Sequence, residues 1–268
     1  MVLCFIGDIM DMRRHRLIIG ADLKEFARPC DFLIGNFEAT ITDARKTRPA
    51  AQRQDPAILD SLVDLFPPCH TALSVANNHA GDFSADIWHH SISLMEQRGF
   101  HVFGFNRNVF VDFQDQARIV AASLWSNLPS SDIVPYESLD QYVLPAGFNI
   151  AYPHWGFELE QFPRPSTVRE GMRLLQHYDA LIGHHSHVPQ PLISCNMGDS
   201  IKLIAFSLGD FCSGLKMRKY RYGIICRIEI GPGNNGVWKI GTVEWRYTEV
   251  KPIADKVMKV DLAVDAFV

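Results

Sequence analysis

The chain has 268 residues, of which 47% are hydrophobic and 21% are charged, and its formal net charge is −4. This apolar content excludes an intrinsically disordered chain, and no segment approaches the ~18 uninterrupted apolar residues that a membrane helix needs. The slight excess of acidic residues disfavours a nucleic-acid-binding protein that acts through a basic face. The length fits one large domain, 1–268, rather than two.

The first residues, MVLCFIGD, have the pattern of a core strand. They lack the basic n-region, the apolar h-region and the cleavage site of a signal peptide. The six cysteines form no Cys-x-x-Cys pair, so we interpret them as reduced thiols packed like small hydrophobic side chains. We therefore expect a cytoplasmic protein without a membrane anchor.

Short apolar segments alternate with amphipathic ones along most of the chain. The predicted strands are 2–6, 31–35, 71–76, 117–123, 148–152, 179–183 and 201–207, and the predicted helices are 55–66, 84–99 and 166–178. Segments 222–230 and 237–250 flank the turn-rich 231–236 and predict a β-hairpin. Pro-containing segments 126–147 and 161–167 predict surface loops. Alternating strands and helices followed by antiparallel strands indicate an α/β, or layered α+β, fold.

Helix boundaries are marked by capping residues. Asp55 is the expected N-cap of the first helix, with Pro56 at its first helical position. Ser84 is the expected N-cap of the second helix, and Gly99 is its expected stop.

Polar side chains that suit metal binding directly follow several predicted strands. Sites in open α/β sheets are usually built at these carboxyl ends. The segments supply Asp8, Asn36, Glu38, Asn77, Asn78, His79, Asp82, His154, Glu158, His184, His185, His187 and Asp210. Each residue alone fits an ordinary structural role, but three of the eleven histidines fall within four residues after one strand. Their combination predicts a site.

Carboxylates, an amide oxygen and imidazoles together form a donor set that suits Mn, Fe or Zn. No cysteine joins the set, which argues against a closed structural zinc site. A carboxylate can bridge two cations about 3.5–4 Å apart and hold them for hydrolysis. The pattern therefore indicates metal-assisted hydrolysis.

The order and wording of the motifs GDIMDMR, NFEAT, ANNHAGD, HWGFE, GHHSHVPQP and SLGDF resemble the capsule-synthesis CapA family. The resemblance runs from about Leu3 to Phe211. It implies a calcineurin-like metallophosphoesterase fold, which is a four-layer α-β-β-α sandwich, and an association with poly-γ-glutamate capsule assembly.

The resemblance also implies roles for the matching residues. Two divalent metal ions, with the first site weaker, are implied to bind Asp8, Glu38, Asn78, His154, His185 and His187. Within this set Asp8 and His187 serve the first ion, Glu38 bridges, and the other three serve the second. His79 is implied as the general acid, with Asp82 orienting its ring, and His184 is left as structural. Arg13 is a candidate phosphate contact, with a surface charge as the equal alternative.

Two positions depart from the resemblance. Met10 stands where metallophosphoesterases commonly have His, which leaves the first metal short of a ligand. Asp210 stands where the family more often has Asn, and an added carboxylate there can orient a ligand or tune a pKa.

Three functions remain open: a metal-dependent phosphoesterase, a metal-dependent amide (γ-glutamyl) hydrolase, and a non-catalytic binding subunit. The expected partner is a small phosphoester or an anionic polymer, and nucleic acid is not expected. Basic residues Arg45, Lys46, Arg48 and Arg53 can attract an anion, although we favour a solvated loop. Trp155 is a candidate for lining the pocket, whereas we expect Trp125 to lie in the core.

Overall fold

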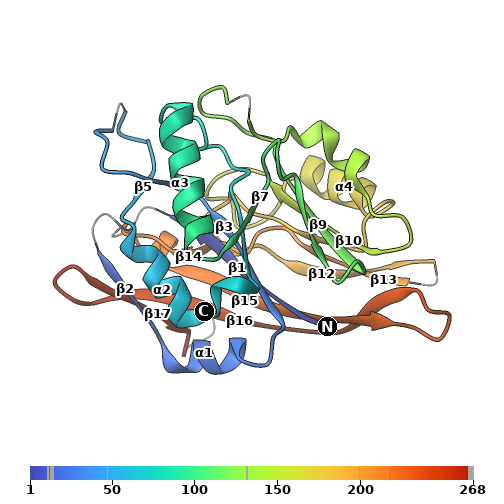
Figure 1. Cartoon of the computed structure of the whole chain (residues 1–268). Coiled ribbons are helices and arrows are strands. Elements are labelled where there is room, and N and C mark those ends of the chain that lie inside the picture. Colours follow the sequence, from blue (N-terminus) through green and yellow to red (C-terminus); the bar gives the residue numbers. More distant parts are fainter. Residues whose placement is uncertain are drawn as a thin grey trace.

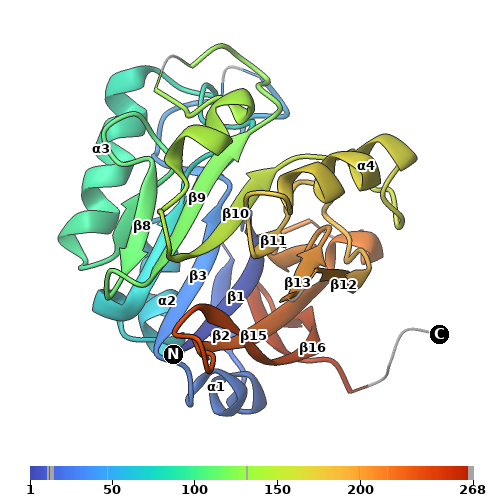
Figure 2. The same ribbon diagram turned by 90° about the vertical axis from the view of Figure 1, so that its right-hand side faces the viewer.

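Two β-sheets stacked face to face form the centre of the protein (Figures 1 and 2). The computed structural model describes residues 1–10, 12, 15–46, 48–130, 132–198, 200–215 and 217–264. Helices lie on the outer face of each sheet, so the molecule has four layers in the order α-β-β-α. The predicted fold class is confirmed.

The larger sheet combines a parallel part with an antiparallel part. Its spatial order is β2 (Arg16–Ile19), β17 (Val257–Leu262), β16 (Trp238–Ala254), β15 (Tyr222–Pro232), β1 (Val2–Ile9), β3 (Phe32–Phe37), β6 (Thr71–Ser74) and β7 (His101–Phe103), with β14 (Asp210–Cys212) also beside β1. Strands β1, β3, β6 and β7 run parallel to one another. Strands β15 and β16 pair antiparallel, which confirms the predicted hairpin.

The smaller sheet is parallel at its centre and antiparallel at both edges. Its order is β12 (Leu192–Met197), β13 (Ser200–Ala205), β11 (Ala180–Ile182), β10 (Phe148–His154), β9 (Ala117–Ser123) and β8 (Phe110–Phe113). Strands β4 (Thr40–Ile41) and β5 (Arg53–Gln54) form a separate short pair. The carboxyl ends of β10 and β11 therefore lie at the same edge of this sheet.

The central strands are apolar on both faces because both faces are covered. In β1, Leu3 and Phe5 point into the core between the sheets, whereas Cys4 and Ile6 point toward the outer helices. Strand β9 repeats this alternation, with Ile119 facing the other sheet. Because successive side chains of a strand point to opposite faces of its sheet, the apolar residues form three layers: one between the sheets and one under the helices on each outer face.

Helices α1 (Ala21–Ala27), α2 (Ala57–Leu65) and α3 (Ala85–Gln97) cover the larger sheet, and α4 (Pro165–Leu174) with the 3₁₀ helix η2 (Tyr136–Tyr142) covers the smaller one. Two further 3₁₀ turns are η1 (Pro68–His70) and η3 (Arg218–Tyr220). Trp155 belongs to the core beneath α4, where its Nε1–H donates to the carbonyl of Phe206 (3.0 Å). The side chain of Trp155 points to the outer face of the smaller sheet, into the apolar layer under α4. The expectation that it lines the pocket is therefore wrong.

Helix boundaries agree with the sequence in part. Ser84 caps α3 by accepting a hydrogen bond from the backbone of Ile87, and Gly99 ends it with a φ of 90°. Helix α2 begins one residue later than expected, because Pro56 occupies the N-cap and Asp55 accepts from Ala57 N (2.9 Å). The predicted loop 126–147 contains η2. Strands β2, β7, β8, β12, β14 and β17 were not predicted; they are only three to six residues long.

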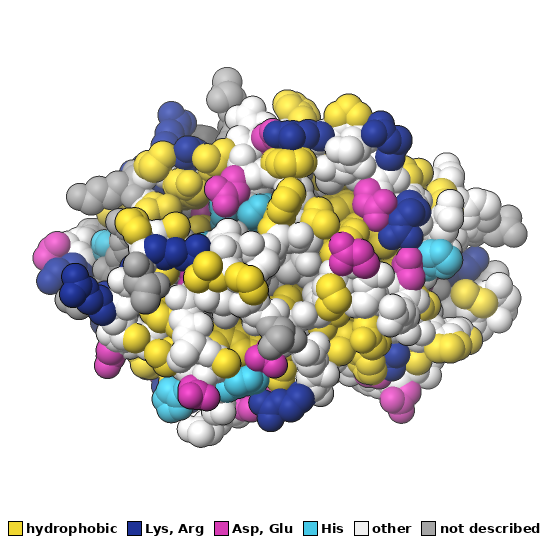
Figure 3. Space-filling view, turned by 90° about the horizontal axis from the view of Figure 1, so that it is seen from above, with side chains coloured by type: hydrophobic (Ala, Val, Ile, Leu, Met, Phe, Trp, Pro, Cys, Tyr) yellow, Lys and Arg dark blue, Asp and Glu magenta, His cyan; other side chains and the backbone are white. Residues whose placement is uncertain are grey.

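The surface in Figure 3 shows Lys and Arg side chains interspersed with Asp and Glu and with apolar groups. This mixture is in line with a formal charge of −4. Among the described residues, no helix combines the length and the apolar character required to cross a bilayer.

Candidate metal centre and acid–base pair

Residues predicted to bind metal converge at the carboxyl ends of strands from both sheets. Asp8 lies on β1, Glu38 follows β3, His154 ends β10, and the loop after β11 carries His185 and His187. These side chains are almost entirely buried, with at most 6% exposure. Two sheets whose strand ends meet at one place thus bring together residues that are far apart in the sequence.

Asp8 is held rigidly by hydrogen bonds to both of its oxygens. Oδ1 accepts from Asn36 Nδ2 (2.7 Å) and lies 3.0 Å from His184 Nδ1, while Oδ2 accepts from the backbone of His185 (3.1 Å). The backbone N–H of Asp8 donates to the Gly209 carbonyl (2.8 Å). Gly7 allows this close contact of the two backbones, because a Cβ there would lie 2.1 Å from the same carbonyl oxygen. Burial favours the neutral acid, but the surrounding imidazoles hold the pKa of Asp8 well below its usual value.

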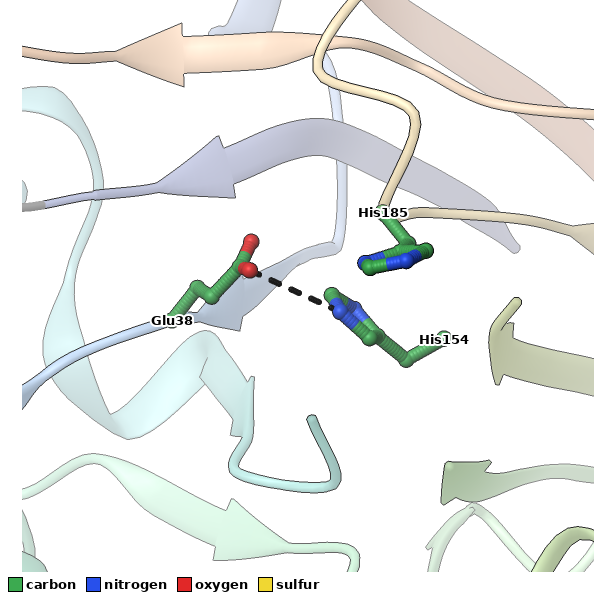
Figure 4. Close-up of side chains that lie close together, drawn as sticks. All are labelled: Glu38, His154 and His185. Atoms are coloured by element: carbon green, nitrogen blue, oxygen red, sulfur yellow. Dashed lines mark ion pairs between the residues drawn. The ribbon is translucent and has the colours of Figure 1, made fainter. Parts of the chain in front are cut away.

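Glu38 lies at the centre of the cluster, and its carboxylate points toward the imidazoles of His154 and His185 (Figure 4). Oε1 is 3.5 Å from His154 Nε2, 3.7 Å from His187 Nε2 and 3.8 Å from His79 Nε2. Neither carboxylate oxygen has a hydrogen-bond partner among the described residues. Burial, reinforced by the charge of Asp8, raises the pKa of Glu38 well above its usual value.

His154 and His185 form one side of the cluster. His154 Nε2 lies 3.0 Å from Asn78 Oδ1, and its ring centroid is 4.6 Å from that of His185. Burial lowers the pKa of His154, and it lowers the pKa of His185 to about 3. Both rings are therefore neutral at physiological pH, which is the form that binds a metal.

His187 forms the other side, and Asp210 fixes its orientation. The Nδ1 of His187 is 3.0 Å from Asp210 Oδ1, so Nε2 is left facing Glu38. Burial lowers the pKa of His187, but the charges of Glu38 and Asp210 outweigh it and raise that pKa. His185 and His187 both adopt positive φ values, 90° and 57°. Such backbone costs about 1–3 kcal/mol per residue and clusters at functional sites.

His79 and Asp82 form a hydrogen-bonded pair beside the cluster. The Nδ1 of His79 is 2.6 Å from Asp82 Oδ2, which also accepts from the backbone of Gln52 (2.7 Å). Burial opposes ionisation of Asp82, but the bonds from His79, Gln52 and Arg48 hold its pKa below the usual value. Because Nδ1 is engaged, Nε2 is the nitrogen that faces Glu38.

The candidate ligand atoms fall into three overlapping groups, and within each group all of these atoms lie within 4.8 Å of one another. Two groups, Glu38 with His154 and His185, and Asp8 with Glu38 and His187, share Glu38. They contain the carboxylates and imidazoles of the two sets that the resemblance implies, and Asn78 Oδ1 lies 3.0 Å from His154 Nε2. The third group joins the exposed Glu158 to His185 and His187. Glu158 was noted in the sequence without a role, and only its three-dimensional position brings it to the cluster.

Some residues lie where the sequence did not predict them. Trp125 was expected in the core, but it is 37% exposed and its ring lies 6.2 Å from that of His185. Arg48 was interpreted as part of a solvated loop, but it forms an ion pair with the buried Asp82. Arg13 lies outside the described residues. Met10 is buried, and its backbone N–H donates to the Cys212 carbonyl (3.0 Å).

Comparisons with known proteins agree with the motifs. Residues 3–120 and 138–215 match the model of the family described as "Bacterial capsule synthesis protein PGA_cap". The chain is also 21% identical over 287 residues to the PGA biosynthesis protein CapA of Bacillus subtilis (strain 168). That match covers 95% of this chain and 74% of CapA.

Two solved structures with TM-scores above 0.5 share the fold at low sequence identity. A hypothetical protein from Thermus thermophilus has a TM-score of 0.56 and 14% identity, with 93% of this chain and 99% of the other covered. A putative 5′-nucleotidase from Staphylococcus aureus has a TM-score of 0.52 and 12% identity, with 91% and 54% covered. The calcineurin-like phosphoesterase YfkN from Bacillus subtilis scores 0.47 at 12% identity, with 92% and 90% covered. Since the family match spans most of the chain, this protein belongs to the bacterial capsule synthesis protein family.

Proposed function

We propose that this protein is a metal-dependent phosphoester hydrolase, in which Glu38 would belong to the ligand sets of two metal ions. One observation carries the proposal: the carboxylate of Glu38 is buried without a hydrogen-bond partner among the described residues, and imidazoles surround it. A buried charge without a partner is costly unless a cation compensates it. The proposed identity of the metal is Mn, Fe or Zn, which suit mixed oxygen and nitrogen donors.

The residues present fit two such ions. Asp8, Glu38 and His187 would hold one, and Glu38, His154 and His185 would hold the other, with the Asn78 amide oxygen beside it. Asp210 and Asn36 orient His187 and Asp8, as partners of metal ligands commonly do. Glu158 is available at the open side of the cluster. When bound, such ions polarise a phosphoryl oxygen and lower the pKa of a water toward ~7.

His79 would supply the proton that the leaving oxygen needs. Asp82 holds Nδ1, so the imidazolium presents its Nε2–H toward the centre of the cluster. A water oxygen bonds to phosphorus opposite the leaving oxygen and releases one proton to solvent. As the bond between phosphorus and the leaving oxygen breaks, the proton of His79 moves to that leaving oxygen. The ring ends neutral and keeps its bond to Asp82. A positioned general acid of this kind contributes about 10²–10⁴-fold.

The experiment is a measurement of metal content followed by a panel of phosphomonoesters and phosphodiesters with added Mn²⁺. We expect two equivalents of metal and Mn²⁺-stimulated hydrolysis. The variant His185→Ala should lose metal and activity together. Full metal binding with hydrolysis that does not depend on it would contradict the proposal. A small phosphoester, or an anionic polymer carrying one, is the proposed substrate class, and a cytoplasmic location stays a prediction.

A second candidate, a non-catalytic subunit in capsule assembly, has one observation in its favour. The Bacillus subtilis relative is a PGA biosynthesis protein, and its match covers 95% of this chain. For this candidate, the site would bind a metal and an anionic polymer without cleaving either an ester or an amide. Normal metal content with no turnover of phosphoesters or γ-glutamyl peptides would favour it. Turnover of the γ-glutamyl peptides alone would instead indicate an amide hydrolase.

A further inference from the structure

Arg48 joins the acid–base pair from a distant part of the chain. Its Nη2 donates to Asp82 Oδ1, while the other oxygen of Asp82 faces His79 Nδ1 at 2.6 Å. The Asp82 side chain is fully buried, and that of Arg48 is 28% exposed. The three side chains therefore form a continuous row, Arg48–Asp82–His79, that ends 3.8 Å from Glu38 Oε1.

Two loops hold this row in place. The backbone N–H of Gln52 donates to Asp82 Oδ2 (2.7 Å), and Arg48 Nη1 donates to the Asn127 carbonyl (3.5 Å). Asn127 also donates through its backbone N–H to the Asn78 carbonyl (3.0 Å). Gly81 permits the contact between loops, because a Cβ there would lie 2.4 Å from the Leu128 carbonyl oxygen. Arg48 thus links both loops to the segment that carries His79.

The charge of Asp82 needs a partner at every stage of the proposed reaction. While His79 is an imidazolium, its positive charge compensates the buried carboxylate. Once Nε2 has given its proton to the leaving oxygen, the ring is neutral and compensates it no longer. Leaving a buried charge uncompensated is strongly unfavourable. The guanidinium of Arg48 is a permanent cation whose planar fork suits a carboxylate.

We propose that Arg48 is a positioning residue, which keeps Asp82 ionised and bonded to Nδ1 of His79 before and after the proton leaves Nε2. This inference rests on the proposed phosphoester hydrolysis. Arg48 acts through Asp82 and His79, so its contribution depends on how much the leaving group needs an acid. An alkoxide leaving group needs the proton, whereas a nitrophenolate leaves readily without it.

The test compares Arg48→Ala and Arg48→Lys with the wild type on alkyl and nitrophenyl phosphoesters. For Arg48→Ala we expect kcat on alkyl esters to fall about 10- to 100-fold, since residues in one hydrogen-bonded network couple strongly. On nitrophenyl esters kcat should change less than about threefold, with KM and metal content unchanged. Arg48→Lys should recover part of the loss, because it keeps the charge without the fork. Arg45→Ala is the matched control, because Arg45 is exposed in the same loop.

A double-mutant cycle separates positioning from substrate binding. In a His79→Asn background, Arg48→Ala should cause no further loss, because the group it positions is gone. An equal loss on both ester classes, or an undiminished loss without His79, would overturn the proposal and indicate a direct phosphate contact or a role in folding. A wild type that hydrolyses no ester would instead overturn the proposed function.

An NMR measurement tests the positioning role independently of catalytic activity. The His79 Nδ1 proton bonded to Asp82 should give a downfield ¹H NMR resonance in the wild type and in Arg45→Ala. We expect this resonance to disappear or shift in Arg48→Ala while the circular dichroism spectrum stays native. An unchanged resonance in Arg48→Ala would contradict the positioning role, whatever the activity.

Discussion

Charged side chains are partnered differently in two regions of the molecule, the strand ends around Glu38 and the C-terminal strands β15–β17. Around Glu38, buried side-chain atoms such as both of its carboxylate oxygens, and Oδ2 of Asp210 on β14, lack hydrogen-bond partners among the described residues. In the C-terminal strands, charges pair at the surface, as in Arg227–Glu244 and Lys259–Asp261. Unpaired buried polar atoms cost stability, so at neutral pH the first region carries a cost that a bound cation would remove, whereas the second region does not.

The strongest test of this contrast is Glu38→Gln. Activity should fall to background, because the amide cannot bridge two cations as a carboxylate does. The metal-free protein should become more stable by about 1–3 kcal/mol at neutral pH, since burial raises the pKa of Glu38 and makes its ionised form unfavourable. A raised pKa costs stability above the unfolded value, so the gain should vanish as the pH falls toward ~4. Metal analysis and urea unfolding after chelation measure both effects.

Glu244→Gln is the matched control for that variant, because Glu244 pairs with Arg227 on the larger sheet at 46% side-chain exposure. It should leave metal content unchanged and alter stability by no more than about 1 kcal/mol. A metal-free Glu38→Gln protein that is less stable than the wild type would refute the contrast between the regions.

His79→Asn is expected to have the next largest effect. The kcat for phosphoesters should fall about 10²–10⁴-fold, because the proton donor is removed. Metal content should stay at the wild-type level, since His79 belongs to none of the candidate ligand groups. His90→Asn, at an exposed position of α3, should change neither quantity. Loss of metal from His79→Asn would show instead that this imidazole is a ligand.

Much of this arrangement was predictable, because local patterns determine it. Strand β9 has the predicted bounds, 117–123, since its apolar run is uninterrupted. Asp8 and Glu38 lie close together because β1 and β3 are parallel neighbours whose carboxyl ends share one edge. His154, at the end of β10, joins them from the other sheet. The spacing of the motifs does not show which histidine is the acid and which are metal ligands. Only the family resemblance implied that His79 is the general acid.

Contacts between loops were not predictable in the same way. Arg48 and Asp82 are 34 residues apart, and no periodic pattern relates them. Trp125 has the apolar character of a core residue, but its Nε1–H donates to the Gly156 carbonyl (2.7 Å) at the rim of the cluster. Short strands such as β2 and β17 become recognisable only through their pairing: β2 pairs with β17, and β17 also pairs with β16. Contacts set by tertiary packing leave little trace in a single sequence.

Ile228→Ala tests the stabilising role of the C-terminal strands. Ile228 lies on β15, is fully buried, and pairs with Leu3 of β1 in the core between the sheets. Its truncation should cost about 2–4 kcal/mol in urea unfolding, because lost burial adds to an unfilled cavity. The folded variant should keep its metal and its kcat. Ile253→Ala on β16 is the control, because that side chain is 54% exposed and should matter by no more than about 0.5 kcal/mol.

The smallest expected effect concerns Asp261, which caps a helix from a neighbouring strand. Helix α1 follows Gly20, which has no side chain to cap it, and Asp261 Oδ1 accepts from Leu23 N (3.0 Å). A Cβ at Gly20 would lie 1.9 Å from the Asp261 carboxyl carbon, so glycine makes room for this substitute cap. Asp261→Ala should therefore cost about 1 kcal/mol at pH 7.

The charge of Asp261 should stabilise the fold at neutral pH, whereas the charge of Glu38 destabilises the metal-free fold, and both effects should vanish at low pH. Burial opposes ionisation of Asp261, but Lys259 and the backbone N–H groups of Leu23 and Leu262 outweigh it and lower its pKa. A lowered pKa stabilises the fold above the unfolded value of ~3.9, and the contribution is lost as the pH falls through the folded pKa. The difference between Asp261→Ala and the wild type should therefore shrink toward pH 3, whereas Asp255→Ala, at an exposed turn, should show none. A difference that is constant from pH 3 to 7 would mean that the carboxylate charge does not carry the cap.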